Sequence, residues 1–209
     1  MKEWTENEMA DEVIGLIPNR SIINLGIGLP TIIADRVPSE KNIIIHSENG
    51  VLGVKGSPEK NEVSPTLINA GKETISVHPG ASYFNSAMSF GMIRGGHIDA
   101  TVLGTMEVDT SGSLANWSVP GKKITGMGGA MDLVNGPKIV IVMSYHLTKA
   151  SESKLVKECT LPLTGKNVVN YVVTNFGIFA PDKNKNMFQI IKLASDEIIE
   201  KLDKNLFYK

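Results

Sequence analysis

The chain has 209 residues, of which 42% are hydrophobic and 21% charged, and its 21 basic and 22 acidic side chains give a net charge of −1. This composition is typical of a globular protein with a sizeable core and excludes a mainly disordered chain. No basic stripe indicates a nucleic-acid partner or an anionic membrane, and no apolar run approaches the roughly 20 residues that span a bilayer. The single cysteine, Cys159, and the polar, acidic first residues predict a cytoplasmic protein without disulfides.

The first half of the chain alternates helical and extended patterns. Hydrophobic spacing predicts a helix over residues 6–17, which Pro18 ends. A buried strand over 21–25 is expected to lead into the turn Gly26-Ile27-Gly28, and Pro30 then suits the start of a short helix. The next expected elements are a strand over 43–45, a loop over 53–66, a short strand over 74–77, a helix over 82–93 and a strand over 98–103.

The second half adds several strands and one terminal helix. The expected elements are a hairpin around 109–117, a strand over 138–143, a charged helix near 151–158, two short strands over 171–179, a hairpin-like segment over 187–194 and a surface helix over 195–205. Strands that alternate with helices predict an α/β fold, with an open, mostly parallel sheet flanked by helices and an added β-hairpin region. No linker divides the chain, so we expect a single domain over 1–209.

Several common catalytic signatures are absent from the sequence. The glycine turns lack the spacing of a dinucleotide site, and the chain has neither a phosphate-binding loop nor a nucleophilic serine elbow. The four histidines show no metal-ligand spacing. Hydride transfer, ATP hydrolysis, serine hydrolysis and zinc catalysis are therefore all disfavoured, and we expect no metal.

A carboxylate, Glu48, follows the strand expected over 43–45. Ligands of parallel sheets bind just beyond the carboxyl ends of the strands, which is where Glu48 is expected to lie. It is either an exposed turn residue or a nucleophile or general base at the mouth of the sheet. A glutamate is already ionised at neutral pH, so it needs no neighbouring base to attack a carbonyl. The oxyanion that forms needs hydrogen-bond donors, which the glycine-rich segment over 126–132 can supply from its backbone.

Six ordered blocks of sequence resemble the β subunit of family I CoA-transferases, most closely the 3-oxoacid type that uses succinyl-CoA or exchanges acetate or butyrate with acetoacetate. The blocks are SENGVLG (47–53), LINAGKET (67–74), PGASYFNSAMSFGMIRGGH (79–97), LANWSVPGK (114–122), GMGGAMDLVNG (126–136) and CTLPLTGK (159–166). The resemblance implies the CoA-transferase fold, which is similar to that of NagB and RpiA, and an α subunit as partner in a heterodimer or heterotetramer. It also implies acyl-CoA and small carboxylic acids as substrates and no cofactor, since coenzyme A is itself a substrate.

The resemblance assigns roles to individual residues. Glu48 is expected to attack the acyl-CoA and to carry CoA as a glutamyl thioester, and Gly129 matches the backbone donor to the oxyanion. Asn24 and Lys72 match positions that contact CoA or the acyl carboxylate. The remaining expected CoA or substrate contacts are Gly26, Gly28, Asn49 and Gly128.

Each assignment has a simpler structural alternative. Asn24 can serve only to bond the backbone of its turn, Lys72 can be a solvated surface residue, and the glycines can simply permit tight turns. Two functional alternatives also remain, a CoA-thioester hydrolase or transferase for other acids, and a structural or regulatory subunit that keeps the fold. The loops over 54–66 and 144–149 depart from the family pattern, which leaves the identity of the acids open.

Overall fold

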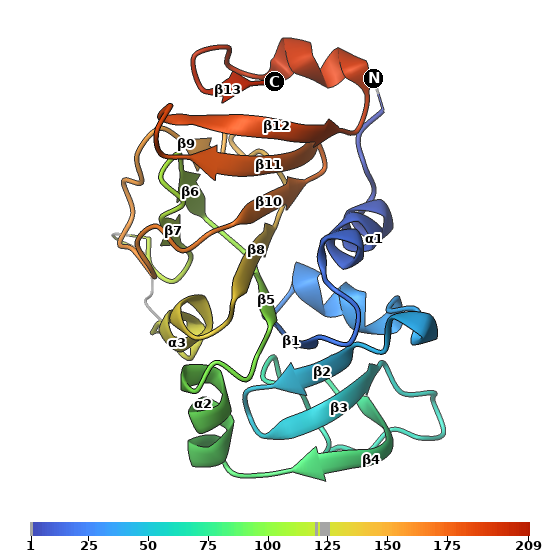
Figure 1. Cartoon of the computed structure of the whole chain (residues 1–209). Helices are drawn as coiled ribbons and strands as arrows, with labels where there is room; N and C mark the ends of the chain where they lie inside the picture. The colour runs from blue at the N-terminus through green and yellow to red at the C-terminus, as the bar shows by residue number, and fades with distance from the viewer. Residues whose placement is uncertain (1, 120, 122–125) are drawn as a thin grey trace.

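A ten-stranded sheet forms the centre of the computed structural model, which describes residues 2–119, 121 and 126–209 (Figure 1). Its strands are β1 (Ile22–Leu25), β2 (Ile44–Ser47), β3 (Val51–Gly56), β4 (Ser76–Tyr83), β5 (Ala100–Leu103), β8 (Ile139–Met143), β10 (Tyr171–Thr174), β11 (Gly177–Asp182), β12 (Met187–Leu193) and β13 (Phe207–Tyr208). They are ordered β13-β12-β11-β10-β8-β5-β1-β2-β3-β4. The five central strands, from β10 to β2, are parallel, and β3, β4, β11 and β12 extend the sheet with antiparallel pairings. This confirms the expected open, mostly parallel α/β sheet.

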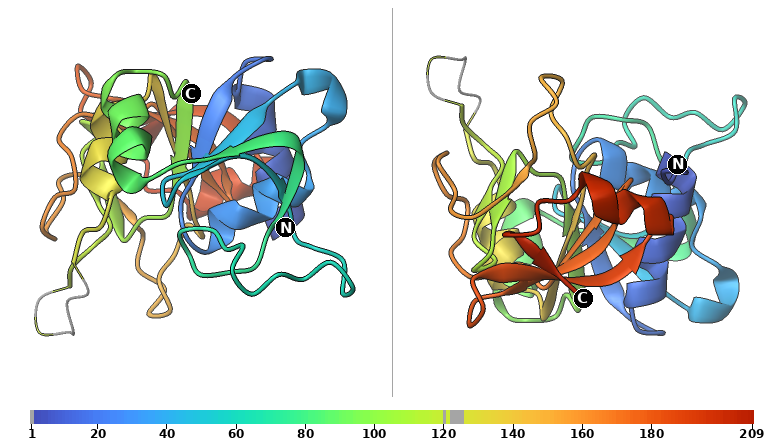
Figure 2. Two further views of the ribbon diagram at one scale, coloured as in Figure 1. Left: turned by 90° about the horizontal axis from the view of Figure 1, so that it is seen from below. Right: turned by 90° about the horizontal axis from the view of Figure 1, so that it is seen from above.

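Helices and a small second sheet surround this sheet. The helices are α1 (Glu6–Leu16), α2 (Ser86–Arg94) and α3 (Ala130–Asn135), and the 3₁₀ helices are η1 (Leu29–Asp35), η2 (Ser39–Lys41) and η3 (Asp196–Lys201). The second sheet contains β6 (Glu107–Asp109), β7 (Leu114–Ala115) and β9 (Leu155–Val156), and its antiparallel β6–β7 pair is the expected added hairpin. Seen from below, α1 lies on one side of the main sheet, and α2 and α3 lie on the other (Figure 2).

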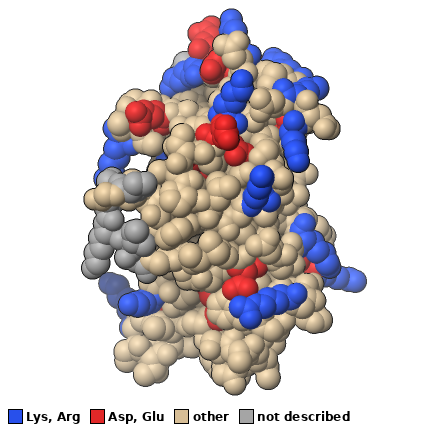
Figure 3. All heavy atoms as spheres, turned by 90° about the vertical axis from the view of Figure 1, so that its left-hand side faces the viewer, with Lys and Arg blue, Asp and Glu red and all other residues tan. Residues whose placement is uncertain are grey.

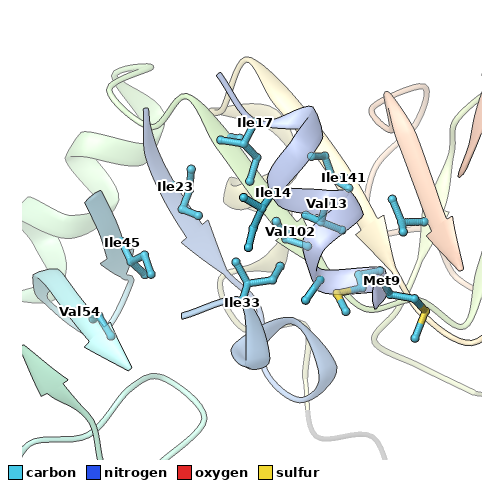
Figure 4. Packing of buried hydrophobic residues seen from close by; sticks show 14 of the residues in the cluster. Met9, Val13, Ile14, Ile17, Ile23, Ile33, Ile45, Val54, Val102 and Ile141 are labelled. Carbon is cyan, nitrogen blue, oxygen red and sulfur yellow. The ribbon is translucent and has the colours of Figure 1, made fainter. Parts of the chain in front are cut away.

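Helix α1 illustrates how the sequence pattern becomes packing. Thr5 caps its N-terminus in a capping box, in which Thr5 and Glu8 satisfy each other's free backbone N–H groups. The spacing of Met9, Val13 and Ile14 places these side chains on one face, which is buried against the sheet (Figure 4). The helix ends at Leu16, one residue before the expected end.

The central strands are hydrophobic on both faces because helices cover both sides of the sheet. In β8, Ile141 and Met143 join the core under α1, whereas Val140 and Val142 join the core under α2 and α3. Successive side chains of a strand point to opposite faces, so a continuous apolar run fills two cores. The same alternation decides which polar side chains of β1 and β2 share a face.

Four expectations about local structure are wrong. The expected loop over 53–66 is a strand, β3, as far as Gly56, and the helix expected from 82 begins at Ser86, because β4 continues to Tyr83. The expected charged helix over 151–158 contains the short strand β9. The segment over 187–194, expected to be hairpin-like, is the single strand β12, which forms its hairpin with β11. The helix expected over 195–205 is present as the shorter 3₁₀ helix η3. The local patterns also do not predict helix α3. In the sequence block LANWSVPGK (114–122), residues 120 and 122 lie outside the described residues.

The described part of the chain contains no helix that is long and apolar enough to cross a membrane. Figure 3 shows the side of the molecule that lies to the left in Figure 1. On this side, blue Lys and Arg atoms are interspersed with red Asp and Glu atoms around broad uncharged areas. No stripe of one sign crosses this face.

Candidate active site

The register between β1 and β2 places two polar side chains beside each other. Asn24 and His46 are paired positions of these parallel strands, one residue beyond the pair Ile23 and Ile45, whose side chains belong to the core under α1. Asn24 and His46 therefore point to the opposite face, toward α2. The amide Nδ2 of Asn24 donates a hydrogen bond of 3.0 Å to Oε2 of Glu48, which follows β2. The site therefore lies at the carboxyl ends of β1 and β2.

A tight turn presents Glu48. The N–H of Gly50 donates to the carbonyl of Ser47 (2.9 Å), and the N–H of Phe84 donates to the carbonyl of Gly50 (3.0 Å). Gly50 has φ +120°, and a Cβ built on it would collide with the carbonyl oxygen of Phe84. Only glycine fits this position, so the turn fixes Glu48 against the segment that leads into α2.

We expect Gly50→Ala to lower the free energy of unfolding by about 3 kcal/mol or more, since it combines left-handed strain with a backbone clash. Urea denaturation followed by circular dichroism measures this loss. Gly96→Ala is the matched control, because Gly96 also has positive φ (+73°) but a Cβ built on it would meet no atom within 4 Å. The control is expected to lose about 1 kcal/mol. Equal losses in the two variants would contradict the clash as the dominant cause.

Gly129 lies against Glu48 although the two are far apart in the sequence. It immediately precedes α3, and a Cβ built on it would be 3.7 Å from Cγ of Glu48 and 2.9 Å from Cζ of Phe90 on α2. A side chain at this position would meet Phe90, so the backbone itself forms this wall of the site. The structure thus brings together three of the predicted residues, Asn24, Glu48 and Gly129.

The other predicted contacts have more varied surroundings. The N–H of Gly26 donates to the carbonyl of Val102 (2.7 Å), and a Cβ on Gly26 would lie 3.0 Å from that oxygen. Gly26 therefore permits the close approach of β1 to β5. Asn49 is exposed, and its Nδ2 donates to the carbonyl of Ile68 (2.7 Å), which ties the loop after β3 to the Glu48 turn.

Gly28, Lys72 and Gly128 share a backbone with positive φ. Gly28 and Gly128 have positive φ, +85° and +54°, in open surroundings. Lys72 is exposed with φ +67°, and its neighbour Gly71 lies against Ile27 of the glycine turn. The binding roles of these residues stay predictions.

Sequence reasoning missed His46 and Ser89, which are both buried beside Asn24. Nδ1 of His46 lies 3.1 Å from Nδ2 of Asn24, and Nε2 of His46 lies 3.0 Å from Oγ of Ser89 on α2. Burial lowers the pKa of His46 to about 4, so the imidazole is neutral at physiological pH. The sequence held no clear signal for His46, because strand periodicity gives the face of His46 on its own strand but not which residue of β1 lies beside it.

A cavity of about 420 Å³ opens at the carboxyl ends of β1, β5 and β8, between Gly28, Thr105 and Tyr145. The partly buried Lys154 lines it, and its Nζ donates a 2.7 Å hydrogen bond to Oγ of Ser144. Burial lowers the pKa of Lys154. This cation was also missed by sequence reasoning, which expected a helix there.

A second cavity, of about 580 Å³, lies on the other face of β2. Ile45 and Ser47 line it together with residues of η1 and of the loop 57–75. His46 of the same strand also lines this cavity, whereas Asn24 does not.

Neither the single cysteine nor a metal group adds a reactive centre among the described residues. Burial, with added repulsion from Asp109 and Glu107, raises the pKa of the Cys159 thiol to about 12, so this thiol stays protonated. Among the described residues, no group of three or more His, Cys, Asp or Glu side chains could hold a metal ion. The catalytic role of Glu48 stays a prediction at this point.

Comparisons with known proteins gave matches over most of the chain. The family model "Coenzyme A transferase" matches residues 7–193. The chain is 54% identical over 185 residues to the B subunit of succinyl-CoA:3-ketoacid coenzyme A transferase of Helicobacter pylori, which covers 87% of this chain and 88% of that protein. It is 51% identical over 158 residues to the beta subunit of acetate CoA-transferase of Haemophilus influenzae, covering 76% of this chain and 70% of that protein. An acyl-CoA transferase of Escherichia coli O157:H7 has a similar fold, with a TM-score of 0.72 at 16% identity, covering 98% of this chain and 43% of that one.

Proposed function

The chain belongs to the coenzyme A transferase family, and from this premise we propose that it is the B subunit of a succinyl-CoA:3-oxoacid CoA-transferase in which Glu48 carries CoA covalently. The observation that carries the proposal is the Glu48 carboxylate, which the buried amide of Asn24 holds beside the backbone of Gly129. A fixed carboxylate at the carboxyl edge of a parallel sheet is well placed for covalent catalysis.

The proposed reaction has two equivalent halves. The Glu48 carboxylate attacks the thioester carbonyl of the acyl-CoA, which forms an acyl–glutamyl anhydride and releases CoA as a thiolate. The thiolate then attacks the glutamyl carbonyl, so that the anhydride breaks into a glutamyl–CoA thioester and the free carboxylate of the first acid. A second acid reverses these steps and leaves as its CoA ester, which regenerates Glu48. Over the whole cycle one acyl-CoA thioester is broken and another is formed, so the reaction needs no cofactor besides CoA as substrate.

Each attack creates negative charge on a carbonyl oxygen. The N–H donors that support the proposal are the Asn24 amide, already bonded to Glu48, and the backbone of Gly129. The acids and CoA are anionic, and the exposed Lys72 and the cavity-lining Lys154 supply positive charge at this edge of the sheet.

We further propose that an A subunit completes the enzyme, as a heterodimer or as a pair of heterodimers. Relatives are named as the B or the beta subunit of their enzymes, which implies a partner subunit. Large apolar side chains near the site are exposed, including Ile27 (64%), Met88 (55%) and Tyr145 (47%). Exposed apolar side chains of this kind are what a contact with another subunit would cover.

Trapping the covalent intermediate tests the proposed function. The chain is purified with its co-purifying subunit, mixed with acetoacetyl-CoA without an acceptor acid, quenched and digested for peptide mass spectrometry. We expect a CoA thioester on the peptide that contains Glu48, together with one released acetoacetate for each site. Succinyl-CoA and acetyl-CoA, used in parallel, show which acids the site accepts.

Three other results would contradict the proposal. Steady loss of acyl-CoA without any acceptor acid would identify a thioester hydrolase instead. An adduct on another peptide, or an active complex without any adduct, would remove Glu48 as the carrier and leave this chain with a structural or regulatory role.

A further inference from the structure

His46 is a buried titratable side chain that the proposed reaction does not use. It is 1% exposed and stacks on Phe84 with ring centroids 5.9 Å apart. Both of its ring nitrogens have polar neighbours, Nδ2 of Asn24 at 3.1 Å from Nδ1 and Oγ of Ser89 at 3.0 Å from Nε2. Asn24 and Ser89 are fully buried as well. The imidazole therefore connects helix α2 to the amide that holds Glu48.

The hydrogen-bond partners fix the tautomer of His46. The Nδ2 group of Asn24 can only donate, so the Nδ1 atom that faces it must present its lone pair. The ring proton is then on Nε2, from which it is donated to Oγ of Ser89. The imidazole thus accepts on the side of Asn24 and donates on the side of α2.

The orientation of the Asn24 amide follows from the same contacts. Its Nδ2 faces three acceptors: Nδ1 of His46, the carbonyl of His46 at 3.3 Å and Oε2 of Glu48 at 3.0 Å. Its Oδ1 is buried and has no hydrogen-bond partner among the described residues. Rotation of the amide by half a turn would place Oδ1 against a carboxylate oxygen and an imidazole lone pair.

An orphaned buried acceptor is rare in folded proteins, and its presence beside a reactive group calls for a reason. Here the reason is that three acceptors, two on His46 and one on Glu48, favour the same orientation of the amide. His46 adds an acceptor that stays in place when Glu48 changes its charge. During the reaction the Glu48 carboxylate becomes an anhydride and then a thioester, so its own attraction for the amide weakens.

We propose that His46 is a positioning residue that keeps the N–H groups of Asn24 directed at the Glu48 carboxyl through both halves of the reaction. The proposal rests on the proposed function of Glu48. His46 acts through Asn24, without contact to the substrate, and Ser89 on α2 holds its tautomer.

A double-mutant cycle tests this role in the complete complex. His46→Leu removes both ring nitrogens and is expected to lower kcat about 100-fold, with KM nearly unchanged. His46→Gln should recover activity to within about tenfold of the wild type, because the glutamine oxygen accepts from Asn24 and its amide donates to Ser89. If His46 acts through Asn24, adding His46→Leu to Asn24→Ala should cause little further loss.

His146→Gln is the matched control. His146 is also buried, bonds a hydroxyl (Oγ1 of Thr174, 3.2 Å from Nδ1) and stacks on a phenylalanine, Phe176, at 4.5 Å. This variant is expected to change stability but not kcat. Independent losses that multiply in the Asn24→Ala, His46→Leu double variant would overturn the proposal. A His46→Leu enzyme that loses thermal stability but keeps its kcat would overturn it too.

A measurement that needs no turnover separates this proposal from the proposed function. Nitrogen NMR of the complex with ¹⁵N-labelled histidine, assigned by comparison with His46→Gln, reports the tautomer of His46. We expect the neutral form with its proton on Nε2. A proton on Nδ1 would overturn the positioning role whatever the covalent trapping shows. A wild-type complex that has the proton on Nε2 but forms no Glu48 adduct would instead contradict the proposed function, and with it the catalytic purpose of the positioning.

Discussion

Glu48→Gln is expected to reduce CoA transfer by roughly 10⁴-fold or more, because an amide is not a nucleophile and cannot form the anhydride. The glutamine side chain has the size and shape of glutamate, and its oxygen can still accept the hydrogen bond from Asn24. The fold and the melting temperature should therefore be unchanged. Consumption of acetoacetyl-CoA in the presence of succinate measures the rate, and the same preparation should form no CoA adduct.

Glu62→Gln provides the control for removal of a carboxylate from this part of the chain. Glu62 is exposed in the loop 57–75, and its substitution should leave the rate within about twofold, as is usual for surface changes. A Glu48→Gln enzyme that retains the wild-type rate would show that the nucleophile lies elsewhere. If activity and melting temperature fell together, the loss would have to be assigned to folding.

Acidification from pH 7 to pH 4.5 is expected to destabilise the protein by several kcal/mol. Burial lowers the pKa values of both His46 and His146 from an ordinary value of 6.5 to about 4. For His146, the negative charge of nearby Glu3 raises the pKa and so opposes part of this shift. In the unfolded chain both histidines take up a proton near pH 6.5, whereas the folded protein resists it. Stability is therefore complete above pH 6.5 and is lost as the pH falls toward 4, by up to about 3 kcal/mol for each histidine.

Urea denaturation at pH 7.5, 6.5, 5.5 and 4.5 measures this dependence. Carboxyl groups whose pKa the fold lowers, such as Glu8 (to about 2), lose their stabilising effect mainly below pH 5, so the histidines dominate above it. His146→Gln should remove about half of the slope between pH 6.5 and 5. An unfolding free energy that is constant over this interval would show that neither histidine is held neutral by the fold.

The sequence predicted the elements that rest on local patterns. The spacing of apolar residues located α1, and apolar runs located β1, β5 and β8, because burial on both faces requires such runs. The polar end of β2 located Glu48. The resemblance to the family then indicated Asn24 and Gly129, which the fold brings to the same carboxylate. A cytoplasmic location and a single domain stay predictions.

Elements that depend on distant contacts were missed. Gly53 and Gly56 made β3 look like a loop, but both glycines adopt positive φ at irregular points of the pairing with β4. The charged segment around Leu155 looked helical, yet Leu155 pairs with Val108 in the small sheet. His46 was overlooked because a single histidine carries no pattern, and only the pairing with Asn24 reveals its role.

The separation of the two faces of β2 affects how such a chain can diverge during evolution. Asn24, His46 and Ser89 lie on one face, and the loop 57–75 covers the other, where it reaches the Glu48 segment through two bonds, from Ala70 to Ser47 and from Asn49 to Ile68. Substitutions in the first part of this loop, over 57–66, which makes neither of these bonds, are expected to leave the carboxylate undisturbed. Natural selection can thus preserve the residues around Glu48 while the sequence of the opposite surface changes.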